Sequence, residues 1–168
     1  MSAPAPSGGL ATLWGLGARV PAPGSWGAAA ALPLGWLAHW AGGFGLFAAT
    51  LAAVTALGWR ATARHLARTG RKDPSEVIVD EVAGQLVALA PLSLGLWLAG
   101  AAPHVFPWPG WVGAFVTFRF FDILKPPPVS WAERLPGAAG VMADDLVAGV
   151  LAALCVTLAA ALAHGWLA

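Results

Sequence analysis

A stretch without charged residues over residues 82–102 constrains the fold more than any other feature of this sequence. As an α-helix it would be about 30 Å long, which matches the hydrocarbon thickness of a bilayer. Only 10% of the 168 residues are charged and the mean hydropathy is +0.72, whereas ordinary soluble domains carry about 25% charged residues. The stretch and the composition together predict a membrane protein.

Four further apolar stretches predict helices, at residues 28–40, 44–59, 111–124 and 146–168. The first is short for a membrane span and could be re-entrant. Gly42 and Gly43 predict a break after it, and Pro126, Pro127 and Pro128 end the fourth helix in the chain. We therefore expect an all-α, compact multi-pass bundle with about four to five membrane segments. It would form one domain over residues 1–168, of which residues 1–9 are a flexible N-terminal lead.

A cluster of basic residues follows the second apolar stretch. Arg60, Arg64 and Arg68 recur every fourth residue, so they share one helical face, and Arg71 and Lys72 follow. The positive-inside rule places this segment in the cytoplasm. Alternating segments then put the N-terminus inside, the C-terminus outside and the acidic and basic residues at or near the cytoplasmic side. The basic face either only fixes this topology or also attracts anionic lipid headgroups.

The net charge excludes one class of function, and the cysteine content excludes two kinds of structural site. The net charge is +1, so the sequence lacks the basic surface of a nucleic-acid-binding protein. The single cysteine, Cys155, excludes an intramolecular disulfide and a cysteine-rich zinc site.

Two pairs of adjacent carboxylates precede apolar stretches, Asp80-Glu81 and Asp144-Asp145. We expect each pair in the first turn of a helix, where the helix dipole tolerates negative charge. Docked together, four carboxylates could surround one or two oxygen-preferring metal ions such as Mg²⁺. Alternatively, each pair only marks where a helix enters the membrane.

The segment at residues 118–128 carries three charges at a spacing of three residues, Arg119, Asp122 and Lys125. On one helical face, the two cations suit a phosphate group and the carboxylate suits a metal ion. The alternative is an ion-pair ladder whose long side chains reach toward water.

A glycine-rich loop near the N-terminus reads Pro23-Gly24-Ser25-Trp26-Gly27. Its backbone N–H groups could bind an anion at the start of the next helix. Alternatively, it is a turn in which Ser25 caps that helix.

These motifs resemble the bacterial phosphatidylglycerophosphatase A family over residues 13–150. The resemblance rests on Asp80-Glu81-x-x-Gly84, on Phe118-Arg119-x-x-Asp122-x-x-Lys125-Pro126-x-Pro128, and on Gly140-Val141-Met142-x-Asp144-Asp145-x-x-Ala148-Gly149. The N-terminal loop is similar to the family's P-G-T-x-G-S signature. Here Ser25 stands for the threonine and Ala28 for the last serine.

The resemblance implies an all-helical, Mg²⁺-dependent lipid phosphatase, a phosphoric monoester hydrolase of the bacterial inner membrane. Its substrate would be phosphatidylglycerophosphate, and its products phosphatidylglycerol and inorganic phosphate. The metal ligands would be Asp80, Glu81, Asp144 and Asp145. Phosphate would contact Gly24, Ser25, Gly27, Arg119 and Lys125, and the residues expected to carry catalysis are Asp80, Asp122, Asp144, Arg119 and Lys125. Either water or an aspartate would attack the phosphorus atom.

Two other classes of function remain open from the residues alone. A small transporter could use the acidic cluster as a proton or cation relay, with carboxylates near the middle of the membrane and access from both sides. A non-catalytic scaffold would tolerate neutral residues at the charged positions.

Overall fold

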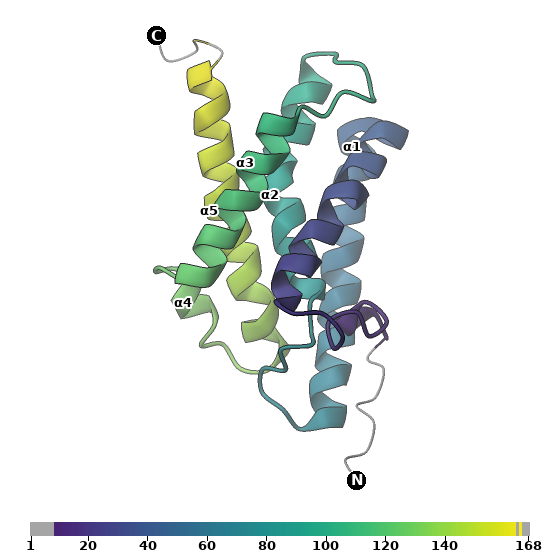
Figure 1. The fold of residues 1–168 in the computed structure, drawn as a ribbon, viewed down its shortest axis with the longest axis vertical. Helices are drawn as coiled ribbons and strands as arrows, with labels where there is room; N and C mark the ends of the chain where they lie inside the picture. The colour runs from purple at the N-terminus through teal and green to yellow at the C-terminus, as the bar shows by residue number, and fades with distance from the viewer. Residues whose placement is uncertain (1–8, 164, 166–168) are drawn as a thin grey trace.

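The computed structural model describes residues 9–163 and 165, and within this part of the chain it contains helices and no strand (Figure 1). This confirms the predicted all-α class. The elements are the 3-10 helix η1 (Gly9–Thr12) and the α-helices α1 (Pro23–Thr69), α2 (Val79–Leu98), α3 (Trp108–Leu124), α4 (Val129–Ala132) and α5 (Ala138–Ala163). Gly9, expected in the flexible lead, already belongs to η1, and the rest of that lead lies outside the described residues.

Helix α1 is a hairpin of two antiparallel helical legs (Figure 1). The chain reverses at Gly42 and Gly43, whose dihedral angles are not helical; Gly43 has φ +60° and ψ −154°. Only glycine adopts this conformation without strain. A Cβ atom at Gly43 would also lie 2.8 Å from Trp97 of α2, so the turn packs closely against its neighbour. The predicted break is confirmed.

The helices have the length and surface of a membrane bundle. Helices α1, α2 and α5 are each long and apolar enough to cross a membrane. Helix α3 has 17 residues, and it runs beside them in the direction opposite to α5 (Figure 1). Large apolar side chains such as Leu154, Leu158 and Leu162 of α5 are exposed, which suits a surface that faces lipid rather than water. The predicted multi-pass helical bundle agrees with this arrangement.

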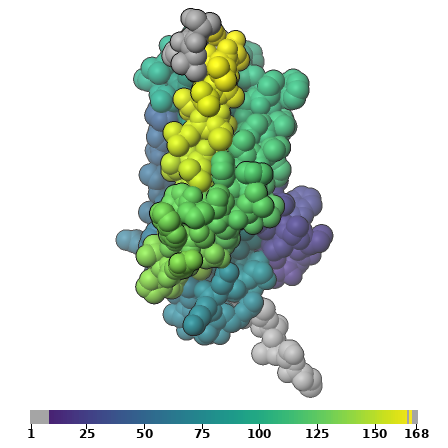
Figure 2. Space-filling view, turned by 90° about the vertical axis from the view of Figure 1, so that its left-hand side faces the viewer, coloured from purple at the N-terminus to yellow at the C-terminus, as the bar shows by residue number. Residues whose placement is uncertain are grey.

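Helix α2 lies at the centre of the bundle and packs against α1, α3 and α5. Its Leu86 and Leu89 are fully buried, together with Phe47 of α1 and Phe118 of α3. Figure 2 shows α5 and α3 side by side across one face of the molecule, with the chain that leads into α5 below them.

Two predicted helix starts are wrong. Helix α5 begins at Ala138 rather than after residue 143, so Asp144 and Asp145 lie in its second turn and not its first. The left-handed Gly137 (φ +62°) ends the preceding loop, and the small and apolar residues after it are already compatible with a helix.

Helix α1 begins at Pro23, with Ala22 as its N-cap, so Ser25 lies inside the first turn and is not the cap. The amide of Ser25 donates to the carbonyl of Ala22 at 3.0 Å. Proline at the first helical position explains this start, because its fixed φ suits the helix and its missing N–H would have no partner there.

The segments that carry the charged residues gather at one end of the bundle (Figure 1). The second leg of α1 ends there at Thr69, and the loop from Thr69 to Val79 leads directly into α2. Helix α3 ends at the same side, followed by α4 and the start of α5. The two acidic pairs, in the first turn of α2 and the second turn of α5, therefore lie at the same end of the bundle.

Candidate active site

Two glycines allow α2 and α5 to cross in direct contact beside the acidic residues. A Cβ atom on Gly84 of α2 would lie 2.5 Å from the carbonyl oxygen of Asp145, and one on Gly149 of α5 would collide with the carbonyl of Gly84. Small residues at a crossing let helix backbones approach closely within a membrane. The glycines that follow each acidic pair therefore bring the two pairs together.

Three carboxylates converge at this crossing. Oxygen atoms of Asp80, Glu81 and Asp145 all lie within 4.8 Å of one another. Asp80 and Asp145 are buried, with 7% and 4% of their surfaces exposed. Within residues 9–163 and 165, none of the three forms an ion pair, and Glu81 Oε2 is buried without a hydrogen-bond partner. Buried carboxylates at this spacing repel one another unless a cation or protons compensate them.

Asp144 lies apart from this cluster, because its side chain turns toward a lysine. Lys125 Nζ donates to Asp144 Oδ2 at 2.9 Å and to Glu133 Oε1 at 2.5 Å. Burial opposes the charge of Lys125, but these two carboxylates outweigh it and raise the pKa of the lysine above its ordinary value. Lys125 follows the last turn of α3 with a left-handed backbone, so it does not continue the helical face of Arg119 and Asp122.

Arg119 and Asp122 form an ion pair with each other on α3. This is the first half of the ladder considered as an alternative from the sequence; Lys125, its expected second half, pairs elsewhere. The Nε atom of Arg119 is buried without a partner among the described residues. Arg119 therefore keeps an unused donor while Asp122 holds its guanidinium in place.

The first acid of each pair accepts a hydrogen bond from the backbone of the second. The amide of Glu81 donates to Asp80 Oδ1 at 3.1 Å, and that of Asp145 donates to Asp144 Oδ1 at 3.0 Å. These matching contacts engage one oxygen atom of each aspartate, and the other oxygen of Asp144 accepts from Lys125.

The three N-terminal residues predicted to contact phosphate lie in different surroundings. A Cβ atom at Gly24 would lie 2.5 Å from Glu81 Oε1 and 3.0 Å from Arg119 Nη1, so this glycine borders the charged groups. One at Gly27 would lie 2.7 Å from the carbonyl of Ile78, which makes Gly27 a packing position between α1 and α2. Gly24 lines the cavity described next, whereas Ser25 and Gly27 are not among its lining residues.

A cavity of about 820 Å³ opens over these groups. Its wall contains both acidic pairs, the cations Arg119, Lys125 and Arg134, and the acids Asp122 and Glu133. The start of α1 and the loop that precedes α2 complete it. The cavity is thus large enough for a charged headgroup and offers it both carboxylates and cations.

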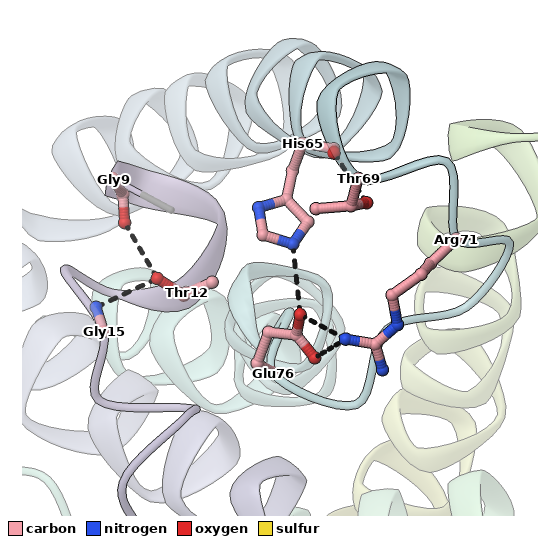
Figure 3. Close-up of polar contacts among 7 residues, drawn as sticks. All are labelled: Gly9, Thr12, Gly15, His65, Thr69, Arg71 and Glu76. Atoms are coloured by element: carbon pink, nitrogen blue, oxygen red, sulfur yellow. Dashed lines mark hydrogen bonds and ion pairs between the residues drawn. The ribbon is translucent and has the colours of Figure 1, made fainter. Parts of the chain in front are cut away.

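A second polar cluster holds the loop before α2 (Figure 3). Glu76 accepts two hydrogen bonds from Arg71 Nη1, at 2.7 and 2.9 Å, and its Oε1 lies 3.4 Å from Nε2 of the buried His65. Burial favours the neutral acid, but the backbone amide, His65 and Arg71 together lower the pKa of Glu76 below its ordinary value. The cluster ties the end of α1 to the residues that lead into Asp80.

The carboxylate cluster fits a divalent cation. Its donor set is entirely oxygen, three oxygen atoms lie within 4.8 Å, and the buried Glu81 Oε2 lacks a partner within the described part of the chain. Hard cations such as Mg²⁺ and Ca²⁺ prefer such ligands. The cluster could therefore hold a metal ion.

Sequence reasoning did not select several residues that the structure places at or near the site. Glu133 and Glu76 lie outside the apolar stretches, so the search for acids within those stretches passed over them. Gln85 is fully buried, and neither polar atom of its amide has a partner among the described residues. It follows Glu81 by one helical turn, and a polar residue inside an apolar stretch was the available signal.

The structure is an apolar helical bundle with a cavity at one end, and the cavity is lined by buried carboxylates and by cations. These features define a membrane protein with a candidate site for a metal ion and an anion. The family comparison is more specific. The chain belongs to the phosphatidylglycerophosphatase A family, whose model matches residues 9–160.

Curated relatives agree with this membership. The chain is 34% identical over 148 residues to phosphatidylglycerophosphatase A of Haemophilus influenzae, which covers 88% of this chain and 84% of the relative. It is 36% identical over 86 residues to phosphatidylglycerophosphatase A of Escherichia coli, covering 50% and 43%. A putative phosphatidylinositol-3-phosphatase of Bacteroides thetaiotaomicron is 38% identical over 89 residues, covering 52% and 50%. No solved structure matches the chain.

Proposed function

We propose that this chain is a Mg²⁺-dependent lipid phosphatase that converts phosphatidylglycerophosphate to phosphatidylglycerol and inorganic phosphate. It would act as a single domain in a bacterial inner membrane, with the site facing the cytoplasm. The family and the names of two relatives support the reaction. The observation that carries the proposal is the convergence of Asp80, Glu81 and Asp145 within 4.8 Å in a cavity that also contains cations.

Asp80, Glu81 and Asp145 would hold the ion, and Asp144 would orient Lys125 beside it. Mg²⁺, when bound, supplies positive charge for the phosphoryl oxygens and lowers the pKa of coordinated water. The remaining chemistry belongs to side chains on α3 and at its end.

Arg119 and Lys125 would bind the phosphoryl oxygens and stabilise the charge that develops on them. Asp122, which pairs with Arg119, would accept a proton from the attacking water. Water adds to phosphorus and the bond to the glycerol oxygen breaks. That oxygen would take the proton that Asp122 accepted from water and become a hydroxyl of phosphatidylglycerol.

The location of the site suits a membrane lipid substrate. The cavity lies where the apolar helices end and the charged segments begin, so a headgroup could enter it while the acyl chains remain beside the bundle. A transporter relay would need carboxylates along the bundle between both ends. The acidic residues instead occur in the segments that gather at one end.

The test is phosphate release by the purified protein in detergent micelles that contain phosphatidylglycerophosphate. Release should require Mg²⁺, stop on chelation, and fall at least 100-fold in Asp80→Asn and in Asp145→Asn. Phosphatidylinositol 3-phosphate and glycerol 3-phosphate, supplied in parallel, measure lipid selectivity. Full activity in both variants would refute the carboxylate site, and no release from any lipid phosphate would refute the enzymatic function.

A further inference from the structure

A groove of about 530 Å³ lies on the apolar surface of the bundle, away from the charged cavity. Its walls come from the second leg of α1, with Val87 of α2 at one side. The α1 residues that line it are Leu51, Ala52, Thr55, Ala56, Trp59 and Arg60. None of these residues lines the cavity at the acidic cluster. The two sites are therefore separate.

The groove continues directly into the basic face of the same helix. Ala52 and Ala56 precede Arg60 by eight and four residues, and Arg64 and Arg68 follow at the same spacing. Because α1 is helical through Thr69, each of these residues lies beside the next, and together they form a stripe that winds gradually around the helix. The stripe changes from small apolar residues to arginines as it approaches the charged end of the bundle.

The three arginines of this stripe form no ion pair with another described residue. Arg60, Arg64 and Arg68 are exposed, and the ion pairs of residues 9–163 and 165 include none of them. The nearby Arg71, in contrast, is paired with Glu76. Exposed, unpaired arginines at the end of an apolar groove are suited to an anionic partner that carries an apolar chain.

Trp59 lies where the apolar chain of such a partner would meet its charged group. Trp59 is partly exposed, lines the groove and directly precedes Arg60 in the sequence. Tryptophan is enriched where the hydrocarbon of a bilayer meets its headgroups. An acyl chain beside Ala52 and Ala56 would thus place a lipid phosphate next to the arginines.

We infer that this stripe is a binding site for an anionic glycerophospholipid of the surrounding bilayer. One acyl chain lies in the groove and the phosphodiester contacts Arg60 and Arg64. The inference depends on the membrane location of the bundle and not on the proposed reaction.

The test is photo-crosslinking of the full-length protein in nanodiscs. The probes are phosphatidylserine and phosphatidylcholine with the same photoreactive acyl chain, and mass spectrometry locates the labelled residues. Neither probe has a phosphomonoester, so catalysis does not affect the result. We expect phosphatidylserine to label residues 51–59 more strongly than phosphatidylcholine. In Arg60→Gln/Arg64→Gln, the binding of phosphatidylserine should weaken by roughly fivefold per arginine, or about 25-fold in total.

Matched variants separate charge from shape. Arg19→Gln removes an exposed arginine outside the stripe and should leave the labelling of residues 51–59 unchanged. Ala56→Phe fills the groove and should abolish this labelling. Ala53→Phe, at an exposed position that does not line the groove, should leave the labelling intact.

Equal labelling by the two lipids, or unchanged preference in Arg60→Gln/Arg64→Gln, would overturn the inference. Should that variant fail to fold, the wild-type protein still provides a test. Raising the salt concentration from 0.05 to about 0.5 M should remove the preference for phosphatidylserine, because screening weakens exposed charge pairs. A preference that persists in high salt would also overturn it.

Discussion

Lys125 Nζ lies 2.9 Å from Asp144 Oδ2, and this contact separates the two acids of the second pair. Asp144 has a cation beside it, whereas Asp145 faces Asp80 and Glu81 without one. Adjacent aspartates in the same helix thus have different electrostatic surroundings. Their roles should differ in the same way.

Neutralising Asp145 should affect stability in opposite directions with and without metal. Without divalent cations, Asp145→Asn should raise the melting temperature, because it relieves repulsion among three neighbouring carboxylates, two of them on buried residues. With millimolar Mg²⁺, the wild type should gain stability and the variant should gain much less; saturation at 100 times Kd stabilises a protein by about 2.7 kcal/mol. Thermal unfolding with and without chelator measures both effects.

Two other aspartates serve as comparisons for this measurement. Asp144→Asn should lower the melting temperature without metal, since it removes a partner of Lys125. Asp73→Asn changes an exposed acid at the cavity rim and should alter neither the melting temperature without metal nor the stabilisation by Mg²⁺. An identical response of Asp144→Asn and Asp145→Asn would contradict the distinction between the two aspartates.

The ion pairs of Lys125 should contribute to stability at neutral pH and fail only under strongly alkaline conditions. The raised pKa of Lys125 means that its contribution is complete below the unfolded value of about 10.4 and is lost as pH rises through the higher folded value. Lys125→Met should therefore be less stable than wild type at pH 8, and the difference should shrink above about pH 10.5.

The composition makes this alkaline transition easy to assign. The chain has no tyrosine, and its only other lysine is Lys72. Lys72→Met should therefore follow the wild-type pH profile. A difference between Lys125→Met and wild type that stays constant up to pH 12 would argue against the ion pairs as its source.

Glu76 should stabilise the protein above the acidic range. Its lowered pKa means that the contribution is complete above the unfolded value of about 4.3 and is lost as pH falls through the lower folded value. Glu76→Gln should cost on the order of 1–2 kcal/mol at pH 7, as expected for charge-assisted hydrogen bonds, and should reduce the acid sensitivity of unfolding. Denaturation monitored by circular dichroism between pH 3 and 7 measures both effects. An equal cost at pH 3 and pH 7 would show that charge is not involved.

The contact between α2 and α5 should not tolerate a methyl group at the acidic level. Gly84→Ala would bring a Cβ atom to 2.5 Å from the carbonyl of Asp145, so the helices must move apart and separate Asp80 from Asp145. We expect loss of Mg²⁺-dependent stabilisation and a large fall in activity. Gly95→Ala lies on the same helix with open space around it and should be neutral or slightly stabilising. Equal behaviour of the two variants would contradict the close crossing.

The sequence predicted the helices and the approach of the two acidic pairs, because both depend on local patterns. Apolar stretches define the helices, Gly42 and Gly43 define the break, and small residues after each pair indicate close crossing. The predicted start of α5 was wrong because residues 138–143 carry neither a charge nor a cap that distinguishes a loop from a helix.

The pairing of charges within the site was not predictable in the same way. Glu133 reaches Lys125 only because the chain turns after α3 and α4 folds back against α5. Gln85 carries no charge, so nothing in the acidic pattern pointed to its buried amide. Such contacts depend on tertiary packing, which no spacing within one segment encodes.

The reversal at Gly42 and Gly43 also bears on how the chain reaches its membrane. Residues 28–59 contain no lysine, arginine, aspartate or glutamate, and the two legs of α1 join without a hydrophilic loop. A hairpin of this kind can insert tip first during biosynthesis, with both ends left on the side of synthesis. No ionised group then has to cross the hydrocarbon for this part of the protein to assemble.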